Sequence, residues 1–313
     1  MKVLKFGGSS VADSNALSNV INIIKQNKEQ KIVIVVSALG GVTDILSEML
    51  FKAIKKDDNY KMLFSLIEEK HLELIKKFIP IEKQSELISF LKSKINEIED
   101  ILIAVSMINE DTDGIQAKVL SYGEILSSEI IYKILLKSNI DVELLDSKSI
   151  IKTKNINNKD LVDLELSSKN VVKQISKKEN NTFLMSGFIA SDQNNEIKTL
   201  GRGGSDYTAS LLASFLSADI LEIWTDVSGM YTANPSIVSQ AKPIPKLSYQ
   251  EAMELSHFGA KVLYPPTIQP LIEKKIPVII KNTFDNKSPG TIISADYNTQ
   301  EKNVVKGISH IDN

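Results

Sequence analysis

The single arginine of this 313-residue chain lies in a glycine-rich segment that suits the binding of an anion. Of the 37 basic residues, only Arg202 is an arginine and all the others are lysines. A guanidinium holds a carboxylate or phosphate through two parallel hydrogen bonds, whereas an ammonium is a point charge. Chance could explain the position of a single arginine. Its place between Gly201 and Gly203 instead favours a site that requires the planar guanidinium group.

The glycine-rich segment runs on through residues 203–206 into an expected helix over residues 206–216. Ser205 or Asp206 would cap this helix, and capping alone is the simpler explanation. Three glycines and an arginine before the cap exceed what capping requires. The helix N-terminus also offers free N–H groups and the positive end of a dipole, which suit a phosphoryl group. We therefore favour a functional role, in which Asp206 orients Lys5 of the N-terminal segment.

The N-terminal segment combines a lysine with a glycine pair. Lys5 stands in a short β-rich run, and Gly7, Gly8 and Ser9 come directly after that run. Glycines after a strand let the backbone approach a phosphate and aim its N–H groups at the oxygens. The Lys5 ammonium would meet the same oxygens. An edge-strand lysine beside an ordinary turn explains this segment equally well, because glycine pairs are common.

Two further segments carry weaker signals. Thr225, Asp226 and Tyr231 follow an expected strand, where the carboxylate would hold the ribose hydroxyls or the adenine amino group. The tyrosine would line the base, although a turn is the stronger local explanation of this run. Glu124 follows a Ser-Tyr-Gly sequence and would bind a substrate ammonium if it faced a crevice. A glutamate that opens a helix is more often a capping or solvated residue.

Composition argues against several other classes of protein. There is no cysteine, and the three histidines are too scattered to indicate a metal site. A formal net charge of −2 and a pI near 6.0 argue against a nucleic-acid surface. No apolar run approaches the ~20 residues that span a bilayer, so we expect a cytoplasmic protein with no membrane partner. The P-loop and Rossmann phosphate-binding motifs do not occur either.

Short β-rich runs alternate with helical runs, which predicts an α/β fold with a mostly parallel central sheet sandwiched by helices. The region from residue 43 to residue 137 is expected to be mostly helical, and the polar stretch 152–160 to be a surface loop. In such sheets the ligand crevice lies at the carboxyl ends of the strands, so the glycine-bearing turns are expected to face one site. Strands are expected at 3–6, 32–36, 142–145, 182–185, 220–224 and 278–281.

Five ordered motifs together resemble those of the aspartate kinases: residues 5–12, 121–124, 201–207, 225–232 and 258–263. The similarity is greatest to the bifunctional aspartokinase–homoserine dehydrogenases. The resemblance implies the amino-acid kinase fold in two lobes, with residues 1–200 binding aspartate and residues 201–295 binding ATP. Residues 296–313 resemble the start of a regulatory ACT region whose remainder is missing, which favours a truncated chain.

The resemblance also implies the reaction and a role for each motif residue. ATP would phosphorylate the side-chain carboxylate of L-aspartate to 4-phospho-L-aspartate, the first step toward lysine, threonine and methionine. Lys5 and Asp206 would form the catalytic pair, and magnesium would be held mainly through the phosphates rather than by protein ligands. Aspartate would be bound by Ser37, Thr43, Glu124, Arg202 and Ser205. The nucleotide would be bound by Gly7, Gly8, Ser9, Gly203, Gly204, Thr225, Asp226, Tyr231 and Lys261.

Two positions depart from the family pattern, which changes the expected ATP contacts. Ser236 stands where the family usually has an arginine, with Lys242 as a candidate replacement, and Ser228 stands where relatives often carry Asp. The alternatives in the same fold are a kinase of the glutamate 5-kinase or acetylglutamate kinase type. A non-catalytic nucleotide-binding sensor is the alternative outside enzymology. The full-length protein is expected to be a homo-oligomer.

Overall fold

A central sheet of eight strands runs through the molecule, in a computed structural model that describes residues 1–108, 112–157, 159–176, 178–235, 237–257, 263–295 and 307. The strand order is β10-β12-β11-β9-β1-β2-β6-β3, and all neighbours pair in parallel except β11 and β12. The strands are β1 (Lys2–Phe6), β2 (Ile32–Val36), β3 (Glu143–Leu145), β6 (Thr182–Ser186), β9 (Ile220–Thr225), β10 (Lys246–Leu247), β11 (Val278–Asn282) and β12 (Thr291–Ile293).

Helices cover both faces of this sheet, and alternation along the strands explains why. Leu4 and Phe6 of β1 point into one apolar core, whereas Val3 points into the other. The five strand residues Ile32–Val36 are all buried, as expected for a strand between two helical layers. The first core is built with α1 (Ser14–Gln26), α2 (Val42–Ile54), α3 (Leu63–Phe78), α4 (Gln84–Ile108) and α5 (Asp113–Lys137).

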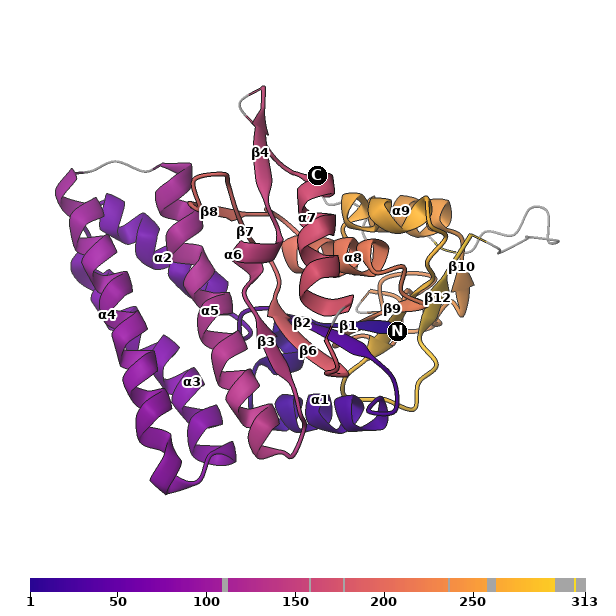
Figure 1. The fold of residues 1–313 in the computed structure, drawn as a ribbon, viewed down its shortest axis with the longest axis horizontal. Helices are drawn as coiled ribbons and strands as arrows, with labels where there is room; N and C mark the ends of the chain where they lie inside the picture. Colours follow the sequence, from indigo (N-terminus) through magenta and orange to yellow (C-terminus); the bar gives the residue numbers. More distant parts are fainter. Residues whose placement is uncertain are drawn as a thin grey trace.

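The second core lies on the opposite face of the sheet. Figure 1 shows α8 and α9 on one side of the strands and α1 on the other. The predicted α/β class, with its mostly parallel sheet sandwiched by helices, is therefore confirmed. The helices of this face are α6 (Ser147–Ile150), α7 (Leu164–Val171), α8 (Gly204–Phe215), α9 (Tyr249–His257) and α10 (Gln269–Ile272).

Strand β1 has the position in the sheet where a ligand crevice is expected. Its register pairs Lys5 with Val35 of β2 on one side and with Ile223 of β9 on the other. The chain thus leaves β1 toward β2, and its second half returns as β9 on the opposite edge of β1. At such a switch the loops after neighbouring parallel strands diverge and leave room for a ligand at their carboxyl ends.

Two small antiparallel hairpins stand outside the main sheet. The expected surface loop at 152–160 is in fact a hairpin of β4 (Thr153–Ile156) and β5 (Lys159–Val162). Its polar residues are explained by exposure of both strands to solvent rather than by irregular structure. The second hairpin pairs β7 (Ile189–Ser191) with β8 (Ile197–Thr199).

The predicted helical region from residue 43 to residue 137 is confirmed as α2 to α5, which stack as an additional layer beside the sheet (Figure 1). Within the described part of the chain, no helix combines the length and apolarity that a membrane span requires. The predictions for Lys261, Ser236 and the 258–262 part of the last motif lie outside the described residues, as does the 296–313 region apart from Gly307.

Candidate active site

A buried ion pair between β1 and α8 forms the centre of the candidate site. The Lys5 ammonium lies 2.7 Å from Oδ1 of Asp206, and the two side chains are only 11% and 13% exposed. Strand alternation explains the pairing, because Lys5 shares the α8 face of β1 with Val3. The carboxylate oxygen forms an ion pair without an aligned hydrogen bond. Two of the predicted residues, 201 positions apart along the chain, thus meet at the carboxyl end of β1.

Helix α8 begins at the glycines that precede Asp206. The residue before the helix is Gly203, which has a φ of 70° and gives no side-chain cap. Capping by Ser205 or Asp206, the simpler explanation of this segment, is therefore excluded, because both residues lie inside the helix. A side chain at Gly203 would lie 2.9 Å from Tyr264, and one at Gly204 would lie 2.7 Å from Phe188. The glycines therefore allow close packing of the backbone, and the first turn keeps N–H groups without a side-chain cap.

The loop after β1 packs closely on the loop after β2 and on β9. The backbone N–H of Gly7 donates to the carbonyl of Trp224 at 3.1 Å. A Cβ on Gly7 would lie 3.5 Å from the Lys5 ammonium, and one on Gly8 would lie 3.1 Å from the carbonyl oxygen of Ala38. Ser9 belongs to the short helical turn that follows. A side chain would thus be accommodated at Gly7, whereas Gly8 is tightly packed against the loop after β2.

Glu124 reaches the same region from α5, which packs on the face of the sheet opposite to α8. Its Oε1 accepts a hydrogen bond from the Ala38 N–H at 3.2 Å, and the residue is only 4% exposed. Gly123 allows this approach, since a Cβ there would lie 2.9 Å from the side chain of Ala38. The second carboxylate oxygen, Oε2, has no hydrogen-bond partner among the described residues. A buried carboxylate with a vacant acceptor is suited to a cationic ligand group.

The charge state of Glu124 depends on its surroundings. Burial raises the pKa of Glu124 to about 7, although the Ala38 N–H and the Lys5 ammonium both lower it. Because the Lys5 ammonium lowers the pKa of Glu124, the two side chains interact electrostatically. A cation bound at Oε2 would favour the ionised form further.

Three other predicted aspartate ligands lie on the loop after β2 and in the first turns of α2 and α8. Ser37 follows β2, where its N–H donates to the carbonyl of Phe6 at 3.2 Å and its carbonyl accepts from Ser127 at 2.8 Å. Thr43 lies in the first turn of α2 and is half-buried. Ser205 is buried in the first turn of α8, where a Cβ on Gly187 would come within 2.5 Å of it. The loops after β2 and β6 are therefore anchored beside the loop after β1.

Three of the predicted nucleotide residues, Thr225, Asp226 and Tyr231, lie at the end of β9 and on the loop that follows it. The Thr225 hydroxyl donates to Asp226 at 3.1 Å, and the carbonyl of Thr225 accepts from Thr283 at 2.9 Å. Asp226 is exposed, and Tyr231 is half-buried and pairs with Pro243. Register places the end of β9 beside the end of β1, so this loop borders the glycine loop.

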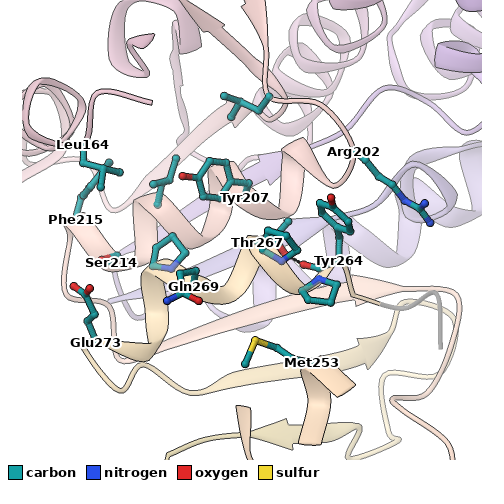
Figure 2. Close-up of a pocket in the computed structure, with 15 residues that line it drawn as sticks. Leu164, Arg202, Tyr207, Ser214, Phe215, Met253, Tyr264, Thr267, Gln269 and Glu273 are labelled. Carbon is teal, nitrogen blue, oxygen red and sulfur yellow. Dashed lines mark hydrogen bonds between the residues drawn. The ribbon is translucent and has the colours of Figure 1, made fainter. Parts of the chain in front are cut away.

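Arg202 is not drawn into the ion-pair centre. Its guanidinium lies 5.8 Å from the ring centroid of Tyr264, and the residue is exposed. Figure 2 shows Arg202 at the rim of an apolar cavity of about 720 Å³, with its guanidinium pointing away from that cavity. The cavity lies against the face of α8 that bears Tyr207 and Leu211. Among the described residues Arg202 forms no ion pair.

Sequence reasoning missed the groups that hold the predicted residues in place. The Ala38 N–H fixes Glu124, and Gly187 gives Ser205 room. Almost every residue has a backbone N–H, so the residue type of Ala38 does not indicate a role. Its place shortly after the buried strand 32–36 was the only indication in the sequence. Gly187 follows the expected strand at 182–185, which was the available signal.

Comparison with known proteins defines the class to which this fold and site belong. The model of the amino acid kinase family matches residues 1–282. That match covers most of the chain, and the chain therefore belongs to the amino acid kinase family.

Within that family, the chain is similar to several aspartokinases. The chain is 38% identical to the bifunctional aspartokinase/homoserine dehydrogenase of Buchnera aphidicola, over 100% of this chain and 38% of that protein. It is 34% identical to the aspartokinase of Chlamydia pneumoniae, over 94% of this chain and 62% of that protein. The chain thus spans little more than a third of the bifunctional relatives. The resemblance read from the five motifs is confirmed.

Solved structures agree with this placement. A structure of E. coli aspartokinase III in complex with aspartate and ADP superposes with a TM-score of 0.85 at 28% identity, over 96% of this chain and 65% of that one. The aspartate kinase of Clostridium acetobutylicum superposes with a TM-score of 0.77 at 30% identity, over 97% of this chain and 64% of that one.

Proposed function

We propose that this chain transfers the terminal phosphoryl group of ATP to the side-chain carboxylate of L-aspartate. The observation that carries the proposal is the buried Lys5–Asp206 pair beneath two glycine loops, with the vacant carboxylate oxygen of Glu124 in the same electrostatic environment. The aspartokinase relatives and the aspartate and ADP complex of E. coli aspartokinase III support the choice of substrates.

The main obstacle to this reaction is the repulsion between the phosphate and the acceptor carboxylate. A fixed ammonium at the position of Lys5 lowers that repulsion and stabilises the charge that develops on the transferring group. Asp206 holds the ammonium in place at 2.7 Å. The N-terminus of α8 and the N–H groups near Gly7 and Gly8 add partial positive charge without a mobile side chain.

Glu124 orients the acceptor by binding its ammonium group through Oε2. A dicarboxylate without an amino group has no cation to place at Oε2. That contact would therefore favour an α-amino acid over a simple dicarboxylate. Ser37, Thr43 and Ser205 supply hydroxyl groups near the same region. In this role the Arg202 side chain must leave Tyr264 to reach a carboxylate.

Thr225, Asp226 and Tyr231 are proposed to hold the nucleoside part of ATP on the loop after β9, with Gly203 and Gly204 at the phosphates. Magnesium would enter with the nucleotide, because phosphate oxygens are ligands that it prefers. The described residues contain no cluster of three or more acidic, histidine or cysteine ligands. Asp206 is the carboxylate best placed to meet the metal ion. When bound, the ion would neutralise part of the negative charge of the phosphates.

The division into an aspartate lobe at 1–200 and an ATP lobe at 201–295 is part of the same proposal. Glu124 and Ser37 come from the first segment, and Asp226 and Tyr231 from the second. Cytoplasmic location and a homo-oligomeric full-length protein remain predictions.

Release of ADP from ATP in the presence of a panel of acceptors tests this function. We expect L-aspartate to give the highest kcat/KM, with glutamate and N-acetylglutamate far lower. Faster turnover of glutamate would identify another activity within the family. Nucleotide binding without phosphorylation of any amino acid would favour the sensor alternative.

A further inference from the structure

A buried hydroxyl of strand β12 supports the proposed nucleotide loop. Thr291 is the first residue of that strand and is 0% exposed. Its Oγ1 accepts a hydrogen bond from the Met230 N–H at 2.8 Å and donates to the carbonyl of Ile244 at 2.6 Å. Met230 directly precedes Tyr231, so the bond is made at the loop itself.

The packing around this hydroxyl leaves no free space. Gly229 has a φ of 117°, and a Cβ there would overlap Oγ1 of Thr291. Gly290 has a φ of 74°, and a Cβ there would overlap the carbonyl oxygen of Ile280. Gly229 is therefore required for the loop to approach β12, and Gly290 is required for the start of β12 to approach β11. The resulting contact fixes Thr291 against residues 229–230.

Thr291 joins two segments that pair with each other. The Ile244 N–H donates to the carbonyl of Met230 at 2.7 Å, and the Thr232 N–H donates to the carbonyl of Lys242 at 2.9 Å. The threonine hydroxyl bonds to both sides of this pairing. Without it, the Met230 N–H would be a buried donor with no partner, which is costly in a dry environment.

We infer that Thr291 is a positioning residue for ATP, acting through the Met230 N–H and Gly229 on the loop that carries Thr225, Asp226 and Tyr231. The inference rests on the proposed function, because it takes this loop as the nucleotide site. Thr291 itself does not touch the reacting groups. Its hydroxyl sets the position of the loop, and its methyl group only fills space.

Two substitutions separate these roles. Thr291→Val keeps the shape of the side chain and removes the hydroxyl, whereas Thr291→Ser keeps the hydroxyl and removes the methyl group. We expect Thr291→Val to raise the KM for ATP about fivefold to tenfold, because the hydroxyl's buried hydrogen bonds to the Met230 N–H and the Ile244 carbonyl are both lost. The KM for aspartate should change less than about twofold in the same variant. Thr291→Ser should retain an ATP KM close to that of the wild type.

Thr153→Val is the matched control. Thr153 is 4% exposed and its Oγ1 has no hydrogen-bond partner among the described residues, so replacing this hydroxyl leaves no partner unsatisfied. It lies on the β4–β5 hairpin, and we expect both KM values to match the wild type. If Thr291→Val does not fold, Thr291→Ala serves instead, because a water molecule can replace the missing hydroxyl. A smaller, selective rise in the ATP KM is then expected.

Equal effects of Thr291→Val and Thr291→Ser, or equal rises in both KM values, would overturn the inference in favour of simple packing. Calorimetric titration with ATP and magnesium gives a second readout that needs no turnover, and the same order of affinities is expected. A wild-type chain that binds ATP without phosphorylating aspartate would refute the proposed function alone, and the variants' ATP affinities would still test the inference. A wild type that binds no nucleotide would overturn both.

Discussion

At the scale of single residues, the ion pair between Lys5 and Asp206 has the clearest expected consequence. Lys5→Ala should lower kcat by ~10²–10³, the usual loss for one group that stabilises transition-state charge. The fold should persist, because an alanine in β1 keeps the strand and its register. Circular dichroism and steady-state ADP release measure the two effects. A loss below about tenfold would move the lysine out of the reacting centre.

Glu124 supplies a prediction about pH at the same scale. The pKa of Glu124 in the free protein is raised to about 7 by burial, and a bound ammonium would lower it again. Aspartate should therefore bind more tightly as the pH rises from about 6 to about 8, and binding below pH 7 should release a proton. Calorimetry in buffers of different ionisation enthalpy measures that proton. Glu124→Gln should abolish the release, and an unchanged proton count in this variant would contradict the role.

The stability of the ligand-free protein should depend on pH in the opposite direction because of Glu124. The pKa is raised from 4.5 in the unfolded chain to about 7 in the folded one. The folded state thus holds the proton more tightly, and the resulting stability is present below pH 4.5 and lost as the pH rises through 7. Glu124→Gln should gain stability over the wild type above pH 7, when measured by urea denaturation without ligand. An ionisable residue at a position where its charge lowers the stability of the fold favours a binding role over a stabilising one.

At the scale of elements, the helical layer contains a buried group that titrates on the acid side. His71 of α3 is 0% exposed, with Nδ1 2.7 Å from the Ile67 carbonyl and Nε2 without a partner among the described residues. Burial lowers the pKa of His71 to about 4. The stability tied to its neutral form is present above pH 6.5 and lost as the pH falls through 4.

His71→Leu should therefore flatten the acid limb of the stability curve. The full effect in the wild type is on the order of 3 kcal/mol, since each pKa unit corresponds to about 1.4 kcal/mol. Urea midpoints at pH 7, 5.5 and 4 measure it, with His310→Leu as a control for the loss of a histidine. Parallel curves for wild type and His71→Leu would show that this ring does not control acid unfolding.

Sequence predicted most elements because burial on both faces leaves an unmistakable pattern. Residues 32–36 are β-branched throughout, and the shortness and β-branched content of this run favour a strand buried on both faces. The hairpin at 152–160 was missed because polar strands lack an apolar alternation. The start of α8 at Gly204 was misassigned because Ser205 and Asp206 are common caps. Only tertiary packing on Tyr264 and Phe188 explains the glycines.

The site was partly predictable for the same physical reasons. Strand order brings the loops after β1, β2 and β9 to one edge, as a parallel sheet requires. The vacant oxygen of Glu124 and the support from Thr291 depend on contacts between distant segments, which periodicity does not encode. Arg202 shows the limit of predicting side-chain contacts from the sequence. Its residue type indicated anion binding, but its side chain lies over Tyr264.

At the scale of the whole molecule, the only tryptophan reports on the meeting of the two halves. Trp224 is 2% exposed at the end of β9, stacks on Phe6 with ring centroids 6.2 Å apart, and lies 4.6 Å from the Lys281 ammonium. ATP with magnesium should change its fluorescence with a midpoint that matches the KM. Aspartate alone should have a smaller effect, because its proposed ligands lie further along the sheet edge. An unresponsive tryptophan at saturating ATP would argue against nucleotide at the end of β9.

The central claim is that a cationic centre around Lys5 joins two anions into an acyl phosphate. Hydroxylamine attacks such a product at its carbonyl carbon, expels phosphate and leaves a stable hydroxamate. We predict that wild-type chain with ATP, magnesium and aspartate yields aspartyl hydroxamate in equal amount to ADP, and that Lys5→Ala yields about 1% of it or less. ADP formed without hydroxamate, or hydroxamate formed equally well by Lys5→Ala, would contradict the account.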